Sequence, residues 1–174
     1  SWLNTKLNNY ETCANVSLPS LVISKINYNP AAMGTFSSDS LEFIEITNNS
    51  NQSVNLTGLY FRELGMSYHF PVNSTIHANQ KIHIASSAAK FAQTYGVAPF
   101  GQYTRCLPNN SQKLVLADAF GNVIDHVEYS DISPWPITAD GLGSFLELID
   151  LNSDNNLASN WKASTQLFSS LQSP

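Results

Sequence analysis

The residues of this 174-residue chain that could bind a metal begin with "DLNSDNN" (150–156). Asp150, Asn152 and Asp154 occur at every second position, which is how a calcium loop of the EF-hand type begins. Such a loop also needs a glycine at its sixth position and a glutamate at its twelfth, where this chain has Asn155 and Trp161. Asx side chains also form turns without any metal. We therefore expect a polar turn and no metal site, with a calcium-stabilised domain as an alternative.

The histidines give little indication of catalysis. They are His69, His77, His83 and His126, and they form no H-x-x-x-H pattern. Asp125 precedes His126, but adjacent residues on a strand point to opposite faces. The chain also lacks a G-x-S-x-G nucleophile motif. We therefore expect no catalytic residues, no cofactor and no enzymatic activity.

Glu42 and Glu45 in "LEFIE" (41–45) could be taken for a pair of catalytic carboxylates. Strand alternation places them on opposite faces, so they cannot share one substrate. Glu45 falls on the same face as Phe43, and a carboxylate buried there would need a partner. Arg62 is the candidate for that partner.

Trp135 lies between two prolines in "SPWPITADG" (133–141). It could be an exposed platform for a ligand, or it could close the end of the domain, whereas Trp161 is expected in the core. Gly141 and Gly143 form a G-x-G pattern after Asp140, but neither neighbouring segment fits a phosphate-binding loop. We expect these glycines to allow a tight turn into the next strand.

Cys13 and Cys106 are the only cysteines, which makes a structural zinc site unexpected. They form either a disulfide or two separate thiols. A bridge would close a long loop and stabilise the fold by roughly 4–5 kcal/mol in the chain-entropy model.

Composition excludes several classes of protein. Hydrophobic residues make up 43% and charged residues 12%, and the net charge is −5. Nucleic-acid binding would need a basic face, so it is not expected. No run of about 18 apolar residues is present, so membrane insertion is not expected either.

The pattern along the chain predicts short strands and one good helix. Strands are expected over 21–28, 41–47, 53–64 (hinged at Gly58), 67–71, 81–86, 113–118, 122–129 and 144–150, with a hairpin turn at 119–122. A serine cap, Phe91 and Tyr95 at i, i+4 and a final Gly96 predict a helix over about 86–95. Residues 1–19 form a separate segment with apolar residues near helical spacing, and 20–174 form one domain with a short C-terminal tail. This arrangement predicts an all-β sandwich.

Several segments occur in the order typical of one family. They are "LVISKINYNP" (21–30), "LEFIEITNNSNQSVNLTGLYF" (41–61), "KIHIASSAAKFAQTYG" (81–96), "KLVLADAFGNVIDHVEY" (113–129) and "SFLELID" (144–150). Over about residues 20 to 164 the chain resembles the bacterial lamin-tail domain. It departs from the family pattern at Leu59, where tryptophan is common, and at Phe145, where a small residue is usual. The resemblance implies an immunoglobulin-like β-sandwich without a catalytic motif.

The resemblance also implies a cellular context. Bacterial lamin-tail domains are accessory modules of large secreted or surface proteins, and residues 1–12 resemble the closing helix of a CotH-like domain. We therefore expect a neighbouring domain before Ser1, an extracellular or cell-surface location, and a role in adhesion or positioning through an unknown protein or surface polymer. A carbohydrate- or polymer-binding module that uses exposed aromatic residues is a further alternative.

Overall fold

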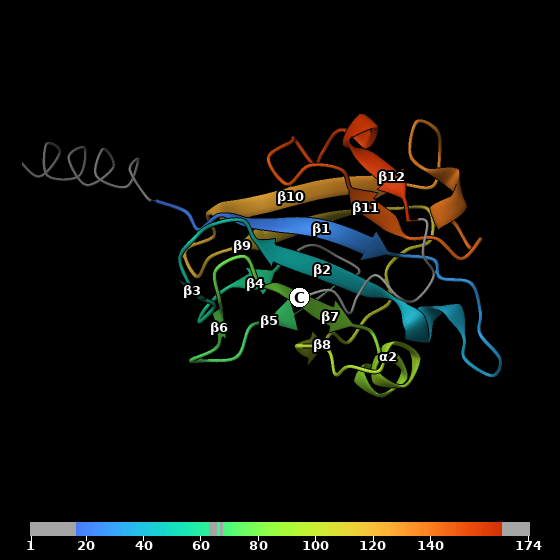
Figure 1. Ribbon diagram of the computed structural model, residues 1–174, viewed down its shortest axis with the longest axis horizontal. Coiled ribbons are helices and arrows are strands. Elements are labelled where there is room, and N and C mark those ends of the chain that lie inside the picture. The colour runs from blue at the N-terminus through green and yellow to red at the C-terminus, as the bar shows by residue number, and fades with distance from the viewer. Residues whose placement is uncertain (1–16, 63–65, 67, 165–174) are drawn as a thin grey trace, which may run out of the picture.

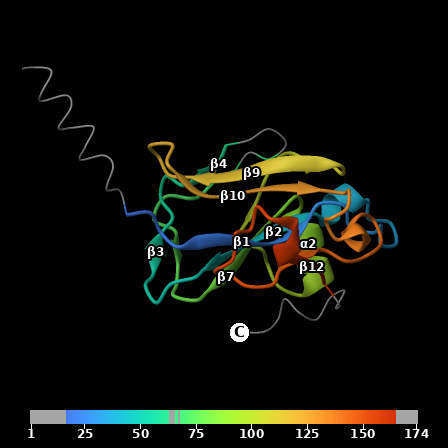
Figure 2. The same ribbon diagram turned by 90° about the horizontal axis from the view of Figure 1, so that it is seen from above.

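A computed structural model describes residues 17–62, 66 and 68–164, and it shows two β-sheets packed against each other (Figures 1 and 2). The larger sheet has the strand order β12 (Trp161–Ala163), β11 (Leu146–Leu148), β1 (Leu21–Asn27), β2 (Phe43–Asn48), β7 (Lys81–Ala85) and β8 (Gly101–Gln102). The smaller sheet has the order β10 (Val123–Ser130), β9 (Ser111–Ala117), β4 (Tyr60–Phe61) and β5 (Tyr68–His69). A separate pair joins β3 (Val54–Asn55) to β6 (Thr75–Ile76). All neighbouring strands are antiparallel except β7 and β8. The expected immunoglobulin-like sandwich is confirmed.

The main core lies between the two sheets, because alternate residues of each strand point inward. Ile44 and Ile46 of β2 meet Leu114 and Leu116 of β9 in one cluster of buried residues. Val127 and Tyr129 of β10 belong to the same cluster. Burial of such side chains stabilises the fold by about 1.5–3 kcal/mol each.

A second, smaller core lies on the outer face of the larger sheet, where helix α2 (Ala88–Tyr95) covers Phe43. Phe91 and Tyr95 of the helix, together with Ala85 and Phe145, complete this cluster. The helix begins where the Ser87 hydroxyl accepts the Lys90 N–H at 3.4 Å. It ends at Gly96, whose φ of 75° is easily reached only without a side chain. The predicted helix and both of its caps are confirmed.

Some elements differ from the sequence-based expectations. The strand expected over 144–150 is shorter, and it is followed by β12, which was not expected. Strands β6 and β8 were also not expected, because two residues are too few to show alternation. Segment 53–64 does divide at Gly58, which has a φ of 83°. Leu59 and Phe145, which depart from the family pattern, are both buried packing residues.

The remaining helical elements of the described residues are single turns: η1 (Ser38–Leu41), η2 (Ile137–Ala139) and η3 (Ala158–Asn160). In the described ranges, no helix has the length and apolar character that crossing a membrane requires. Residues 1–16 of the helical segment expected within 1–19 lie outside the described residues. The C-terminal tail from residue 165 also lies outside them.

Candidate functional site

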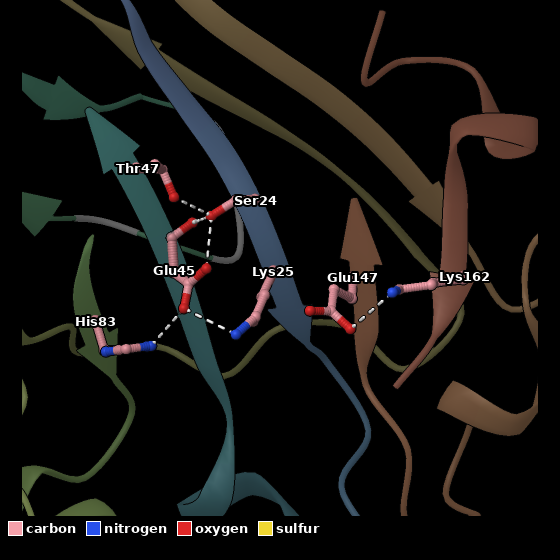
Figure 3. A network of polar contacts seen from close by, with 7 residues as sticks. All are labelled: Ser24, Lys25, Glu45, Thr47, His83, Glu147 and Lys162. Carbon is pink, nitrogen blue, oxygen red and sulfur yellow. Dashed lines mark hydrogen bonds and ion pairs between the residues drawn. The ribbon is translucent and has the colours of Figure 1, made fainter. Parts of the chain in front are cut away.

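A row of charged side chains crosses the outer face of the larger sheet, and it is the most prominent polar cluster of the domain (Figure 3). Strand register aligns Lys162, Glu147, Lys25, Glu45 and His83 on β12, β11, β1, β2 and β7 in turn. Basic and acidic side chains therefore alternate along the row. We call these five residues the charge row.

Glu45 is the centre of the charge row. Its Oε2 lies 3.1 Å from Lys25 Nζ and 2.9 Å from His83 Nε2. Its Oε1 accepts the Ser24 hydroxyl at 2.8 Å, and Ser24 is in turn 2.7 Å from Thr47 Oγ1. The side chains of Lys25 and Glu45 are only 4% and 2% exposed. The second pair, Glu147 with Lys162, is wider at 3.6 Å and closer to solvent.

These contacts fix the ionisation of Glu45. Burial alone raises its pKa, but the hydrogen bond from His83 and the charge of Lys25 outweigh burial and lower the pKa to about 2. Both carboxylate oxygens contact groups of the protein, and the lowered pKa makes Glu45 a weak base toward a substrate. The cluster links β1, β2 and β7. This arrangement is typical of a structural contact between strands and not of a general base that faces a substrate.

Arg62 is not the partner of Glu45, contrary to the expectation from the sequence. It follows β4 of the opposite sheet, and its Nη1 donates to the Gly121 carbonyl at 3.5 Å. Glu45 does share the face of Phe43, as expected, but this face is on the outer side of the sheet. Only residues of the larger sheet or its covering elements can reach it.

Glu42 lies in different surroundings from Glu45, as strand alternation predicted. Its Oε2 accepts the Tyr103 hydroxyl at 3.1 Å and the Leu107 N–H at 2.8 Å. Among the described residues, its Oε1 has no partner. Burial raises the pKa of Glu42 to about 8. The side chain is therefore a neutral acid at pH 7, and it anchors the connection between β8 and β9.

Cys106 lies in that same connection and is exposed, with no disulfide inside the described part of the chain. Partial burial and the nearby Glu42 and Asp39 carboxylates raise the pKa of its thiol. A raised pKa leaves the thiol less reactive than an ordinary cysteine. Cys13 lies outside the described residues, so a Cys13–Cys106 bridge stays a prediction.

Asp125 connects the two sheets, and its carboxylate accepts the backbone N–H of His126 at 2.9 Å. Its Oδ2 accepts the Ile23 N–H at 2.6 Å and the Asn155 side-chain amide at 2.8 Å. The Asn155 carbonyl accepts Trp161 Nε1 at 2.7 Å. Both β1 and β10 have a bulge at this position, between Ile23 and Lys25 and between Val123 and Asp125. We call Asp125, Asn155 and the Ile23 N–H the sheet clasp.

Burial raises the pKa of Asp125, although these hydrogen bonds oppose that effect. The sequence did not indicate this role of Asp125 or the burial of Asn155. The only local signal was an aspartate inside an apolar strand.

The segment 150–156 forms consecutive turns, as expected. Asp150 Oδ1 accepts the Asn152 N–H, and Asp154 Oδ1 accepts the Asn156 N–H, each at 2.9 Å. Asn152 Oδ1 accepts the Asn49 side-chain amide at 3.0 Å. These contacts account for the spacing of the three residues without a metal, and the calcium alternative stays a matter for experiment. In the described ranges, no three His, Cys, Asp or Glu side chains are grouped so that they could hold a metal ion.

Trp135 is buried, which removes the exposed aromatic platform expected from the sequence as one alternative. It is 9% exposed and its ring lies 6.0 Å from that of Trp161, which is also buried. The two prolines around Trp135 are in the connection between β10 and β11. Gly141 and Gly143 have φ angles of 73° and 90°, so the predicted tight turn is confirmed.

The other histidines have only local contacts. His69 stacks on Tyr60 with ring centroids 5.4 Å apart, and His77 Nδ1 lies 3.4 Å from the Ser53 hydroxyl. Among the described residues, neither histidine belongs to a group of three or more side chains that could hold a metal ion.

The fold and this site define a class: an immunoglobulin-like sandwich whose buried polar side chains serve its own architecture. The lamin tail domain family model matches residues 16–131, which are 116 of the 174 residues. The chain belongs to the lamin tail domain family, as the sequence resemblance implied. Domains of this kind are generally non-enzymatic accessory modules.

Comparison with solved structures supports the same fold. A crystal structure of a DUF4876 family protein from Bacteroides thetaiotaomicron VPI-5482 superimposes with a TM-score of 0.57. The two chains are 11% identical, and the match covers 88% of this chain and 70% of the other. At this identity the likeness concerns the fold alone. A search of curated proteins finds no match to this chain.

Proposed function

We propose that this chain is a non-catalytic module of a larger exported bacterial protein and that it positions a neighbouring domain or mediates adhesion. The observation that carries the proposal is the occupation of Glu45, whose two oxygens are bound by Lys25, His83 and Ser24. The side chains best suited to chemistry thus hold strands together. Family membership supports the same role.

The edges of the sandwich indicate how such a module would meet a partner. Strand β10 is an edge of the smaller sheet, and side chains occupy two of its N–H groups. The Glu128 N–H donates to Asn156 Oδ1 at 3.0 Å, and the His126 N–H donates to Asp125 Oδ1 at 2.9 Å. The edge strands β12, β8 and β5 are two or three residues long. Short or occupied edges discourage strand addition, so a partner would contact loops and side chains.

Two assays test the proposal. The chain is fused to a secreted reporter enzyme in a bacterial host, and the reporter is measured at the cell surface and in the medium. Retention above that of a reporter fused to an unrelated immunoglobulin-like domain is expected. The purified chain is also incubated with chromogenic phosphodiester and ester substrates. Hydrolysis that Glu45→Gln or His83→Gln abolishes while the fold persists would overturn the proposal.

A further inference from the structure

The C-terminal quarter of the domain carries an unusual distribution of charge. Between residues 127 and 161 the sequence has no Lys, Arg or His. The same stretch has six acidic residues: Glu128, Asp131, Asp140, Glu147, Asp150 and Asp154. Within the described part of the chain, Glu147 is the one of these six acidic residues that forms an ion pair, and its partner is Lys162. The carboxylates of this stretch are thus largely uncompensated by cations of the domain.

Exposed apolar side chains accompany these carboxylates. Five large apolar residues of the stretch are between 53% and 71% exposed, namely Ile132, Ile137, Leu142, Ile149 and Leu157. Outside this stretch, large exposed apolar residues are scattered, for example Phe120 at the tip of the β9–β10 hairpin. Exposed apolar groups gathered inside a polar rim are typical of an interaction surface.

The fold brings the two halves of the stretch to one side of the molecule. Figure 1 shows the connection after β10 and the connection after β11 around β11 and β12, and Figure 2 agrees. The Trp135 and Trp161 rings, 6.0 Å apart, hold the first connection against β12. The bond from the Glu128 N–H to Asn156 ties the second connection to β10. We call these two connections, residues 131–145 and 149–160, the acidic apolar surface.

This surface begins at residue 131, where the match to the family model ends. Strand β11 nevertheless pairs with β1, and β12 pairs with β11, so the surface belongs to the sandwich. The loops are therefore held in place by the fold, while their five large apolar side chains are left exposed to solvent.

We propose that the acidic apolar surface binds a basic, amphipathic polypeptide segment of a partner protein. The proposal rests on the proposed interaction role and names the chemistry of the partner. Lys and Arg of such a segment would meet the carboxylates, and its apolar side chains would cover the exposed Ile and Leu residues. Complementary charge selects the partner and speeds association, and apolar contact holds it.

Other occupants fit this surface less well. A second copy of the chain has a net charge of −5 and would bring like charge to the same surface. Nucleic acids and anionic membranes would be repelled for the same reason. Residues 1–16 contain one Lys and one Glu, and residues 165–174 contain no charged residue, so neither end of the chain is cationic.

Isothermal titration of the whole chain with three synthetic peptides tests the inference. The first peptide is a fourteen-residue amphipathic sequence of Leu and Lys. The second replaces Leu by Ser at the same charge, and the third replaces Lys by Glu. We expect binding of the Leu/Lys peptide alone, weakened at high salt. Equal binding of the Lys/Ser peptide would show attraction of charge alone and would overturn the inference, as would no binding at all.

Matched variants locate the binding. Ile137→Ser with Leu142→Ser, and separately Asp131→Asn with Asp154→Asn, should each weaken binding about tenfold or more. Phe120→Ser removes a still more exposed apolar group from the β9–β10 hairpin and should leave binding unchanged. Equal loss in all three variants would place the peptide elsewhere and refute the inference, and thermal melting of each variant confirms that it is folded.

This experiment is separable from the test of the proposed function. Reporter retention that persists in the Ile137→Ser, Leu142→Ser variant, together with absent peptide binding, rejects this surface and leaves the module role standing. Hydrolytic activity of the chain would reject the module role, whatever the peptides do.

Discussion

Replacement of Glu42 by glutamine should stabilise the domain at neutral pH. The Glu42 side chain is 1% exposed, and burial raises its pKa from 4.5 to about 8. In the unfolded chain this carboxyl ionises near its ordinary value, so unfolding releases a proton at neutral pH. The stability that Glu42 contributes is therefore fully present below about pH 4.5 and is lost as the pH rises to about 8.

The magnitude follows from the size of this window. One pKa unit corresponds to about 1.4 kcal/mol, so a rise from pH 4.5 to pH 7 costs at most about 3 kcal/mol. Glutamine keeps an oxygen that can accept from Tyr103 and Leu107, and it cannot ionise. We expect Glu42→Gln to gain up to about 3 kcal/mol at pH 7, up to about 4 kcal/mol at pH 8 and little at pH 4. For a domain of this size the gain would raise the Tm by roughly 5–10 °C.

Urea unfolding at pH 4, 6 and 8 measures this gain directly. Glu128→Gln is the matched control, because it removes an exposed carboxylate and should show no comparable dependence on pH. A loss of stability at pH 8 in Glu42→Gln would show that the ionised carboxylate is favoured in the fold. A gain of the same size at all three pH values would equally refute the argument, since it would not follow ionisation.

Three further predictions concern the charge row, the sheet clasp and the turns. Glu45→Gln should destabilise the domain by about 3–5 kcal/mol at pH 7, because it leaves Lys25 buried without its counter-charge. The pKa of Glu45 is lowered to about 2, so its contribution to stability is present above pH 4.5 and falls as the pH drops toward 2. Urea unfolding should therefore show a smaller loss of stability in Glu45→Gln at pH 3 than at pH 7. Equal losses at the two pH values would contradict this. Asn155→Ala should lower the free energy of unfolding by about 1–3 kcal/mol, because it removes a donor to buried Asp125. Asn156→Ala changes the neighbouring residue and should lower it less. The reverse order in thermal melting would contradict the role of the sheet clasp. The Tm should be the same in calcium and in EDTA at one ionic strength, and a rise of many degrees in calcium would restore a metal site at 150–156.

The sequence predicts the fold well where elements are long and end in clear signals. The helix capped by Ser87 and Gly96 is one example, and the hinge at Gly58 is another. The sequence also places Glu45 on the correct face. It cannot identify Lys25 as the partner, because simple alternation from buried Ile23 would point Lys25 into the main core.

A bulge between Ile23 and Lys25 explains this failure. Ile23 of β1 pairs with Ile46 of β2, and the next pair is Lys25 with Glu45. Ser24 is therefore an extra residue in β1, and it shifts the alternation of side chains between the two faces. Ser24 and Lys25 both contact Glu45, while Ile23 and Ile26 are both in the main core. A bulge depends on the pairing of two strands, which a local pattern does not contain. Trp135 was left undecided for a similar reason, since its burial depends on contact with Trp161 from a strand that the sequence did not indicate.

The same bulge connects the charge row to the acidic apolar surface. It turns Lys25 toward Glu45, and at this position the Ile23 N–H donates to Asp125 rather than to a neighbouring strand. Asp125 also binds Asn155, a residue of the connection after β11 that carries part of that surface. A carboxylate that receives a backbone N–H and a side-chain amide, both largely shielded from water, fixes their positions more strongly than an exposed contact would. Asp125, which at first suggested chemistry beside His126, therefore holds in place one of the two connections through which we propose the domain meets its partner.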